Sequence, residues 1–359
     1  LIQELGLQDK VIFPRPLTVM YFNEKFYPFD SILNALRFPG LGFGLNKIRF
    51  GFVGLFLRLT NNWRALEKVT ADAWMMKWAG KQVYEQMWKP LLVGKFGPFY
   101  KDVNMAWMWA RIKARTTRLG TFEGGFQKFA DLFTDQLRGM GVEIRLGTPI
   151  KFIKQNQASG GLNVDVESFD KVLVTTSPSL MAKMCPDLPE DYLKGLLELK
   201  SMGAVVMVLS LKHQLSEQGY YWFSLPKEAG FPLLALVEHT NFVSKDHFGG
   251  DRIVYAGDYL EVGHEYFSLS DEELLERFIP AFKRINPAFE KDWVKKVWVN
   301  KTNYAQPVPL VNHSENIPAI QTPIEGLYFA SMSQVYPWDR GTNFAVEIGR
   351  RAARMMLGK

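Results

Sequence analysis

Residues 326–356 read GLYFASMSQVYPWDRGTNFAVEIGRRAARMM, which predicts a strand, a loop and the start of a helix. The apolar run Leu327–Ala330 is typical of a buried strand, and a polar segment containing proline follows it. A helix then opens at Gly341 and Thr342, with apolar residues at helical spacing: Ala345, Ile348, Ala352 and Met355. Its first turn carries unpaired N–H groups and the positive end of the helix dipole. We expect an electron-rich ligand there, unless this is an ordinary C-terminal helix docked on a sheet.

Composition excludes several classes of protein. The chain has 359 residues, 47% apolar and 22% charged, which fits a globular protein with room for two domains. Its single cysteine, Cys185, excludes an internal disulfide and a cysteine metal cluster and fits a reducing compartment. The histidines lack metal-binding spacing, so we expect no metal site. The net charge of +6 comes from scattered residues, so we expect no nucleic-acid partner. We predict a cytoplasmic protein, with peripheral membrane contact left open.

The most hydrophobic segment predicts a helix over residues 45–59. Its apolar residues share one helical face: Leu45, Ile48, Phe52, Leu55, Phe56 and Leu59. The uncharged run Phe50–Leu57 is far shorter than the ~20 residues that cross a bilayer. The helix is therefore either buried in a helical domain, which we favour, or half-sunk in a membrane interface to admit a lipid-soluble substrate.

Other elements are expected within the first 115 residues. A hairpin turns at Asn23 and Glu24, and a helix begins at the N-cap Thr70 and stops or kinks at Pro90. Another helix spans Met105–Arg115. We expect most tryptophans of this region in the core, although they could line an apolar cavity: Trp74, Trp78, Trp88, Trp107 and Trp109.

The pattern changes at Gly120. The segment GTFEGGFQKFADLFTDQLRGMGVEIRLGTPIKFI predicts a glycine turn, a helix over Phe126–Arg138 and a strand over Val142–Leu146. A polar hairpin, QNQASGGLNVDVES, precedes a second strand, FDKVLVTTSPS, which ends in small polar residues. Strands separated by a helix are the pieces of an α/β sheet, whose strand ends hold ligands.

The following block predicts a mainly antiparallel sheet. Strand patterns cover Gly203–Leu211 and Asp251–Leu260, and another strand leaves through Pro307. Between them a helix spans Asp271–Ile285, with Ser270 as N-cap and glutamate at the capping-box position.

Four segments together resemble the FAD-dependent amine oxidase superfamily, in particular its protoporphyrinogen oxidase, phytoene desaturase and squalene-associated desaturase branch. They are residues 120–153, FDKVLVTTSPS, YAQPVP and residues 326–353. The resemblance covers essentially the whole chain. It implies a mixed α/β (α+β) fold, in which an incomplete FAD-binding Rossmann-like domain of the glutathione-reductase type is interleaved with a helical and antiparallel-sheet substrate domain. It divides the chain into a mainly helical part of the substrate domain (1–115), the middle of the FAD domain (116–185), the antiparallel sheet and helix (186–318) and the end of the FAD domain (319–359).

The resemblance also implies the FAD contacts. They are Ile150 at the adenine; Thr175, Thr176 and Ser177 near the adenosine and pyrophosphate; Glu123, Gly124 and Gly125 near the isoalloxazine; and Trp338, Asp339, Arg340, Gly341, Thr342, Asn343 and Ala345 around the pyrimidine edge and ribityl chain.

One departure from the family is serious. Members open with a strand, a GxGxxG turn and a helix, whereas the glycine clusters here, Gly40–Gly44 and Gly124–Gly125, lack a preceding strand. Because Leu1 reads as mid-helix, the simplest account is an N-terminal truncation that removes a βαβ unit of ~30 residues or more. We expect the full-length protein to bind FAD and this chain to bind it poorly or not at all. Stoichiometric flavin absorbance would contradict the second expectation.

The resemblance implies an FAD-dependent oxidoreductase that removes hydride from a large hydrophobic molecule, such as a polyene, terpenoid or porphyrin-like ring. This chemistry requires no protein nucleophile, so we name one weak catalytic candidate, Arg340, which would offset negative charge on reduced flavin. Alternatively, Arg340 forms a surface salt bridge with Asp339 or Glu347. The alternative functions are a flavin-dependent isomerase or mutase without net oxidation and a cofactor-free lipid-binding remnant.

Overall fold

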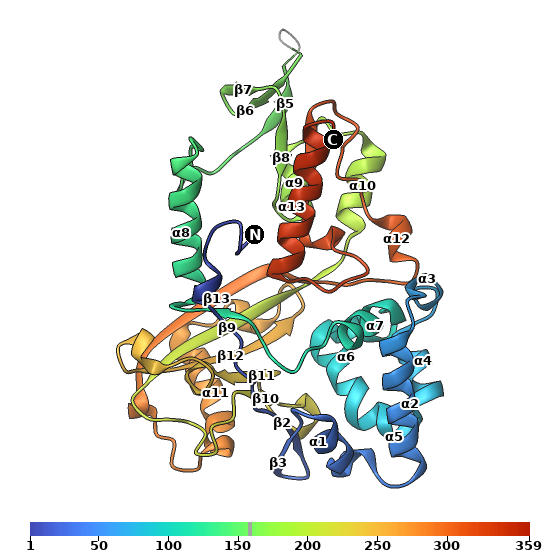
Figure 1. Cartoon of the computed structure of the whole chain (residues 1–359), viewed down its shortest axis with the longest axis vertical. Helices are drawn as coiled ribbons and strands as arrows, with labels where there is room; N and C mark the ends of the chain where they lie inside the picture. Colours follow the sequence, from blue (N-terminus) through green and yellow to red (C-terminus); the bar gives the residue numbers. More distant parts are fainter. Residues whose placement is uncertain (157–159) are drawn as a thin grey trace.

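The structure is a computed structural model that describes residues 1–156 and 160–359. Figure 1 shows helices α1 to α7 gathered beside a large sheet, with α8, α9, α10 and α13 at the other end of the molecule. The first group comprises α1 (Ile32–Arg37), α2 (Leu45–Leu59), α3 (Trp63–Leu66), α4 (Ala71–Ala79), α5 (Lys81–Val83), α6 (Lys89–Phe96) and α7 (Met105–Lys113). The later helices are α8 (Gly125–Gly139), α9 (Pro178–Met184), α10 (Glu190–Glu198), α11 (Asp271–Ile285), α12 (His313–Asn316) and α13 (Thr342–Met356).

The large sheet has the strand order β13-β9-β12-β11-β10-β2-β3. Its strands are β2 (Thr18–Phe22), β3 (Lys25–Pro28), β9 (Ser201–Leu211), β10 (Trp222–Ser224), β11 (Ala235–Glu238), β12 (Arg252–Leu260) and β13 (Val294–Pro307). All neighbours are antiparallel except β10 and β2. Asn23 and Glu24 connect β2 to β3 with φ values of 46° and 62°, which confirms the predicted hairpin. The sheet is therefore mainly antiparallel, as predicted. It also includes the N-terminal hairpin formed by β2 and β3.

Helix α11 covers this sheet through a continuous apolar face. Leu274, Phe278 and Phe282 are buried in one cluster with Leu209 of β9. The Ser270 side chain accepts a hydrogen bond from the Glu273 amide, and the Glu273 carboxylate accepts one from the Ser270 amide. This capping box confirms the predicted start of the helix.

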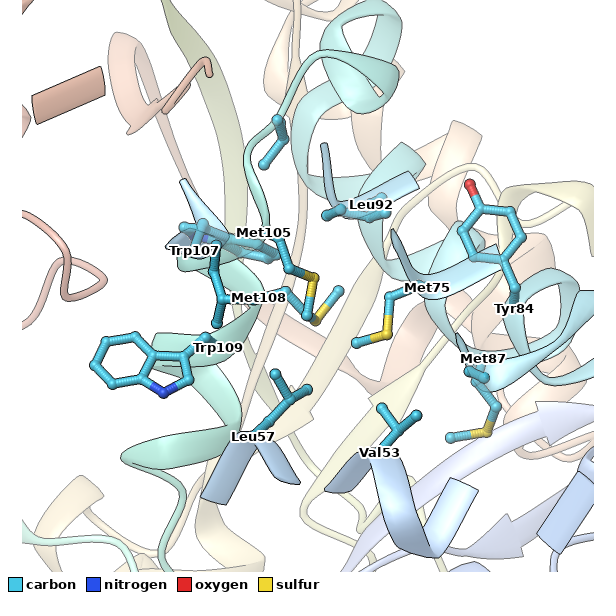
Figure 2. Packing of buried hydrophobic residues seen from close by; sticks show 14 of the residues in the cluster. Val53, Leu57, Met75, Tyr84, Met87, Leu92, Met105, Trp107, Met108 and Trp109 are labelled. Atoms are coloured by element: carbon cyan, nitrogen blue, oxygen red, sulfur yellow. The ribbon is translucent and has the colours of Figure 1, made fainter. Parts of the chain in front are cut away.

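The helical group has a separate core, and Figure 2 shows its centre. Val53 and Leu57 of α2 point toward Met75 of α4 and toward Met105 and Met108 of α7. Trp107 and Trp109 are buried in the same cluster, Trp74 and Trp88 are partly buried against it, and Trp78 is 53% exposed. The expectation that most of these tryptophans belong to the core is confirmed.

One local prediction in this group is confirmed and another is wrong. The Thr70 side chain caps α4 by accepting a hydrogen bond from the Ala73 amide. The helix that begins there does not continue to a stop or kink at Pro90, because α4 ends at Gly80, whose φ of 87° suits glycine. Pro90 instead lies in the first turn of α6, which continues to Phe96.

Helix α2 has the predicted bounds but the opposite orientation. The six residues of its predicted buried face are between 49% and 69% exposed: Leu45, Ile48, Phe52, Leu55, Phe56 and Leu59. The expected burial of that face is therefore wrong. The cause is that α2 is apolar on both sides, and α4 and α7 pack on the narrower side that carries Val53 and Leu57.

The remaining strands are short. Strand β8 (Val172–Val174) pairs in parallel with β14 (Leu327–Phe329), and the start of β14 confirms the predicted C-terminal strand. Strands β5 (Ile153–Gln155), β6 (Leu162–Val164) and β7 (Glu167–Phe169) form an antiparallel sheet. The tip of the predicted polar hairpin, residues 157–159, lies outside the described residues. Strand β1 (Val11–Ile12) pairs with β4 (Thr121–Phe122).

The predicted strand over Val142–Leu146 is absent from the described structure. The amide of Val142 donates to the Leu137 carbonyl and the amide of Gly141 to that of Arg138, so these groups terminate α8. Leu146 is 82% exposed. A strand needs a hydrogen-bonding neighbour, and no described strand pairs with this segment.

Residues 1–6, expected to lie within a helix, form one hydrogen-bonded turn that ends at Gly6.

Buried residues of α9, α10, β8 and β14 form a cluster distinct from the two larger ones. The domain boundaries stay a prediction. In residues 1–156 and 160–359, no helix combines the length and apolarity that spanning a membrane requires.

Candidate functional site

The first turn of α13 is open, as the sequence predicts. Its N-cap, Gly341, contributes no side-chain hydrogen bond to the turn. A Cβ atom at this position would lie 2.9 Å from Asn343 Oδ1, so glycine lets the chain pass close to that side chain. Trp338 stacks on Phe344 with ring centroids 5.8 Å apart and packs on Trp109 of α7 at 5.2 Å. Aromatic rings therefore fix the loop that leads into the helix.

Asp339 anchors that loop to α7. Its Oδ2 accepts a hydrogen bond from Arg111 Nη1 at 2.7 Å, and its Oδ1 accepts from Trp107 Nε1 at 3.3 Å and from the Arg340 amide at 3.1 Å. Burial raises the pKa of Asp339, but Arg111, Lys95 and Arg340 together outweigh it and hold the pKa below its ordinary value. The carboxylate is therefore ionised at neutral pH.

Arg340 turns toward the large sheet. Its Nη2 donates to the hydroxyl of Tyr259 on β12, and its guanidinium lies 5.3 Å from the centre of that ring. Its buried Nε has no hydrogen-bond partner in the described part of the chain. The alternative of a surface salt bridge with Asp339 or Glu347 is wrong, because Arg111 forms the ion pair with Asp339.

Lys95 of α6 is the residue that sequence reasoning missed. Its Nζ lies 3.3 Å from Gln306 Oε1 on β13 and 4.7 Å from the centre of the Tyr259 ring. Burial and then the charge of Arg111 lower its pKa well below the ordinary value, and Asp339 opposes this only in part. Nothing in the sequence around Lys95 signals this role. Gln306 did lie in the quoted segment YAQPVP.

A small hollow lies beside this loop, and its walls include Trp107, Gln306, Pro307, Trp338 and Arg340. Its interior volume is about 20 Å³, which holds about one water molecule. Lys95 and Arg111 do not line it. The Arg340 side chain therefore faces the same small space as the apolar rings.

A second polar network fixes the loop before the hollow. The Tyr336 hydroxyl donates to Glu67 Oε2 at 3.1 Å and accepts from Asn104 Nδ2 at 3.0 Å. Burial, followed by the charge of Glu67, raises the pKa of Tyr336. Burial lowers the pKa of His313, which lines the hollow, to about 4, so its imidazole is neutral at pH 7.

Thr175, Thr176 and Ser177 lie where the predicted ligand-binding strand ends. Since β8 and β14 are parallel and the Ala330 amide donates to the Val174 carbonyl, both strands end at one edge. The loop toward Asp339 starts from this edge. Ser177 also caps α9 by accepting from the Leu180 amide at 3.3 Å.

The other predicted contacts lie apart from the hollow. Gly124 and Gly125 begin α8 with φ values of 83° and 86°, in the left-handed region that glycine tolerates. The Glu123 amide donates to the Lys10 carbonyl, and its carboxylate lies 4.0 Å from His247 Nε2. Ile150 is 39% exposed in the segment between α8 and β5.

The N-terminal segment lies between α8 and α13, which run in the same direction (Figure 1). Gln136 of α8 donates to the Leu5 carbonyl at 2.8 Å, and Arg350 of α13 pairs with Glu4. The last turn of α8 and the middle of α13 therefore flank one shared segment, whereas the predicted FAD contacts lie at the N-terminal ends of both helices.

The group from Trp338 to Ala345 fits the pyrimidine edge of a flavin. The orphaned Arg340 Nε and the uncapped first turn of α13 both offer N–H donors to a negatively polarised group. The family fingerprint for the pyrophosphate is absent from this sequence. The fit therefore rests on the isoalloxazine end of the cofactor.

Comparison with known proteins identifies the family. The sequence model described as flavin containing amine oxidoreductase matches residues 1–357. No curated protein sequence matches significantly.

Solved structures share the fold at low identity. A protein from Exiguobacterium sp. 255-15 assigned as a protoporphyrinogen oxidase has a TM-score of 0.73 and 17% identity, and the match covers 100% of this chain and 84% of that one. Reduced UDP-galactopyranose mutase has a TM-score of 0.74 and 11% identity, with coverage of 100% and 80%. Cyclohexylamine oxidase from Brevibacterium oxydans IH-35A has a TM-score of 0.64 and 12% identity, with coverage of 99% and 83%.

The anchoring role of Asp339 is tested by Asp339→Asn. We expect a loss of about 2 kcal/mol in unfolding free energy at neutral pH, because three donors lose an ionised acceptor. A carboxyl group whose pKa is lower in the folded state stabilises the folded protein. This stabilisation is complete above the unfolded pKa of about 3.9, and it is lost as the pH falls through the pKa of the folded state. The difference between the two proteins in urea unfolding should therefore shrink in acid.

The matched control is Asp292→Asn. Asp292 also pairs with a basic residue, since its Oδ2 lies 3.7 Å from Lys212 Nζ, but its side chain is 75% exposed. It should change the unfolding free energy by less than about 0.5 kcal/mol. An Asp339→Asn effect that stays constant from neutral to acid pH would contradict the ionised anchor.

Proposed function

Because the chain belongs to the flavin-containing amine oxidoreductase family, with FAD as cofactor, we propose that it removes a hydride from a large hydrophobic substrate. The observation that carries the proposal is the first turn of α13, which has no side-chain cap and lies beside the orphaned Arg340 Nε and the stacked rings of Trp338 and Phe344. Bound FAD supplies the hydride acceptor. The protein then has to orient the substrate, exclude water and stabilise charge.

The chain's own residues divide these tasks. Arg340 and the first-turn amides of α13 are placed to hold negative charge at the pyrimidine edge of the flavin. Trp338 and Phe344 stack beside the first turn of α13, where Gly341, Thr342 and Asn343 are exposed and free to meet the flavin. We keep the other residues named for FAD from the sequence as proposed contacts, namely Glu123, Gly124, Gly125, Ile150, Thr175, Thr176 and Ser177.

One feature supports a large hydrophobic substrate. The hollow holds about one water molecule, so it does not receive the substrate. The exposed face of α2 is an apolar surface next to α7, on which α2 packs. A polyene, terpenoid or porphyrin-like ring thus fits better than a small polar amine.

Hydride removal is tested on the protein reconstituted with FAD and made anaerobic. Candidate substrates of the three apolar classes should bleach the visible absorbance of the flavin, and admitting an electron acceptor should restore it. A protein that retains FAD and is never bleached by any apolar substrate, but is bleached by amines, would contradict the proposed substrate class.

A flavin-dependent isomerase or mutase is the second candidate, supported by the similarity to UDP-galactopyranose mutase. That reaction would turn over anaerobically only with pre-reduced flavin, and it would consume no electron acceptor. The cofactor-free remnant is not retained, because FAD is the cofactor of the family.

Arg340 is tested by Arg340→Met. We expect a lower reduction potential for bound FAD, by about 30 mV for each ~1.4 kcal/mol of stabilisation lost from the reduced ring. Potentials are measured by dye equilibration. Arg64→Met is the control, because Arg64 also stacks on an aromatic ring, Trp63, at 4.7 Å, yet it is exposed. Equal potentials in the wild type and Arg340→Met would remove Arg340 from the site.

We also propose that α2 docks on an anionic membrane surface. Its exposed apolar residues form one stripe, and its charged residues are all basic: Lys47, Arg49 and Arg58. This combination favours a helix that lies in the interface between lipid head groups and acyl chains. Basic residues add attraction to anionic lipid.

Docking is tested by sedimentation with liposomes that contain phosphatidylserine. Phe52 is 69% exposed, so Phe52→Lys should leave folding intact and lower the bound fraction at least about tenfold, because it replaces apolar area with charge. The control is Val166→Lys, at a site 93% exposed on the turn between β6 and β7. Equal sedimentation of both variants with the wild type would refute docking through α2.

A further inference from the structure

One face of the large sheet carries a continuous row of uncharged side chains. Residues that pair across neighbouring strands point to the same face, so the strand register defines rows that cross the sheet. One row runs through six strands, from β13 to β2, in the order Trp298, Val208, Tyr255, Val237, Trp222 and Thr18. Every second strand from β13 to β10 therefore contributes an aromatic ring. We call Trp298, Tyr255 and Trp222 the aromatic row.

The aromatic row lies on the face of the sheet opposite α11. Its neighbours along the strands, Leu209, Val254 and Phe223, are buried with α11 in one cluster. Successive residues of a strand point to opposite faces, so the aromatic row points away from that helix. Its three side chains are between 36% and 47% exposed. Large apolar side chains exposed together on one face are typical of a ligand-binding surface.

The adjacent row on this face is also uncharged. It consists of Asn300, Val206, Gly257, Ala235, Ser224 and Met20. The open face of an antiparallel sheet normally carries polar side chains toward water, whereas these two rows contain no charged residue across six strands. The face therefore suits an uncharged ligand. The small residues at the centre of the second row let a flat molecule approach the strands beside the aromatic rings.

Arg340 connects one side of this surface to the proposed flavin site. Its side chain donates a hydrogen bond to the hydroxyl of Tyr259 on β12. Tyr255 and Tyr259 are four residues apart in that strand, so they point to the same face at a separation of about 14 Å along the strand. Gly257 is midway between them. The row of small residues therefore lies between the aromatic row and the residue that binds Arg340.

Glu123 connects the other side of this surface to the proposed flavin site. Its carboxylate lies 4.0 Å from His247 Nε2, in the loop between β11 and β12. His239, at the start of the same loop, packs edge-on against Tyr255 with ring centroids 5.6 Å apart. Both groups of residues proposed to contact the flavin ring therefore reach β12. A ligand on the two uncharged rows would lie between them.

We propose that the aromatic row binds the substrate, and that this substrate is an elongated, conjugated and uncharged molecule such as a polyene. The inference rests on the proposed function and narrows its substrate class. Neighbouring strands are about 4.8 Å apart, so the row extends over roughly 19 Å from Trp298 to Trp222. A linear conjugated chain matches a row that is long and one residue wide, and it can stack on all three rings. A saturated chain offers no π system for this stacking.

The test uses diphenylhexatriene, a linear conjugated hydrocarbon that becomes fluorescent in an apolar site. The probe is titrated into the FAD-reconstituted protein in the absence of lipid, and its emission on excitation of tryptophan measures binding near the tryptophans. Two uncharged competitors define the class of ligand. Octaethylporphyrin is a flat ring, and squalane is a saturated chain.

We expect Trp298→Thr and Trp222→Thr each to weaken binding of the directly excited probe about fivefold or more, because each removes one stacking contact. Both competitors should bind more weakly than the probe. Threonine favours strands and both sites are exposed, so the variants should fold, which urea unfolding checks. Tyr255→Leu is the further variant if either does not fold. Probe attached to α2 would not respond to these changes.

The control is Trp78→Gln, because Trp78 is an exposed tryptophan of α4, outside the sheet. It should leave the affinity for the probe unchanged. An unchanged affinity in either folded variant of the aromatic row would overturn the proposal. Equal or tighter binding of squalane or octaethylporphyrin would also overturn it. Substrates of any apolar class can bleach the flavin in either case, so failure of this inference is distinct from failure of the proposed function.

Discussion

The carboxylate of Asp339 joins the loop before α13 to helix α7 through Arg111 and Trp107. The joined segments are more than 200 residues apart in sequence, since the two bonds span 228 and 232 positions. Tyr336, in the same loop, adds a bond to Glu67 beside α3 and one to Asn104. The helical group and the C-terminal helix are thus held in one arrangement by two sets of polar contacts, of which the ion pair with Arg111 requires an ionised Asp339.

This contact also explains why two neighbouring basic side chains have neutral partners. A carboxylate accepts a limited number of hydrogen bonds, and those of Asp339 are taken by the groups that hold the loop in place. Anchoring and charge compensation therefore compete for one side chain. Anchoring prevails, and Lys95 and Arg340 remain with neutral partners. A structural requirement of the loop thereby decides the hydrogen-bond partners of both side chains.

The sequence predicted the features that depend on local chemistry. The hairpin at Asn23 and Glu24, the capping box of Ser270 and Glu273, and the bounds of α2 follow from turn residues, caps and helical spacing. The open first turn of α13 after Gly341 was predicted for the same reason. These interactions are made between residues close in the chain, so they can be predicted from the sequence.

The features that the sequence did not predict depend on packing partners. The orientation of α2 was misread because both of its sides are apolar, and only the positions of α4 and α7 decide between them. The strand expected at Val142–Leu146 lacks a paired neighbour in the described structure. Lys95 meets Gln306 across 211 positions, a separation at which spacing carries no information. Its place in the site is a product of tertiary structure.

Helix α7 connects the exposed apolar helix α2 to the loop before α13. On one side Trp109 Nε1 donates to the Thr60 carbonyl at the end of α2, and Lys113 Nζ donates to the Arg58 carbonyl at 2.8 Å. On another, Arg111 and Trp107 hold Asp339. Since the same helix packs on α2 and anchors the loop before α13, the positions of the exposed apolar face and of the open first turn are linked through α7.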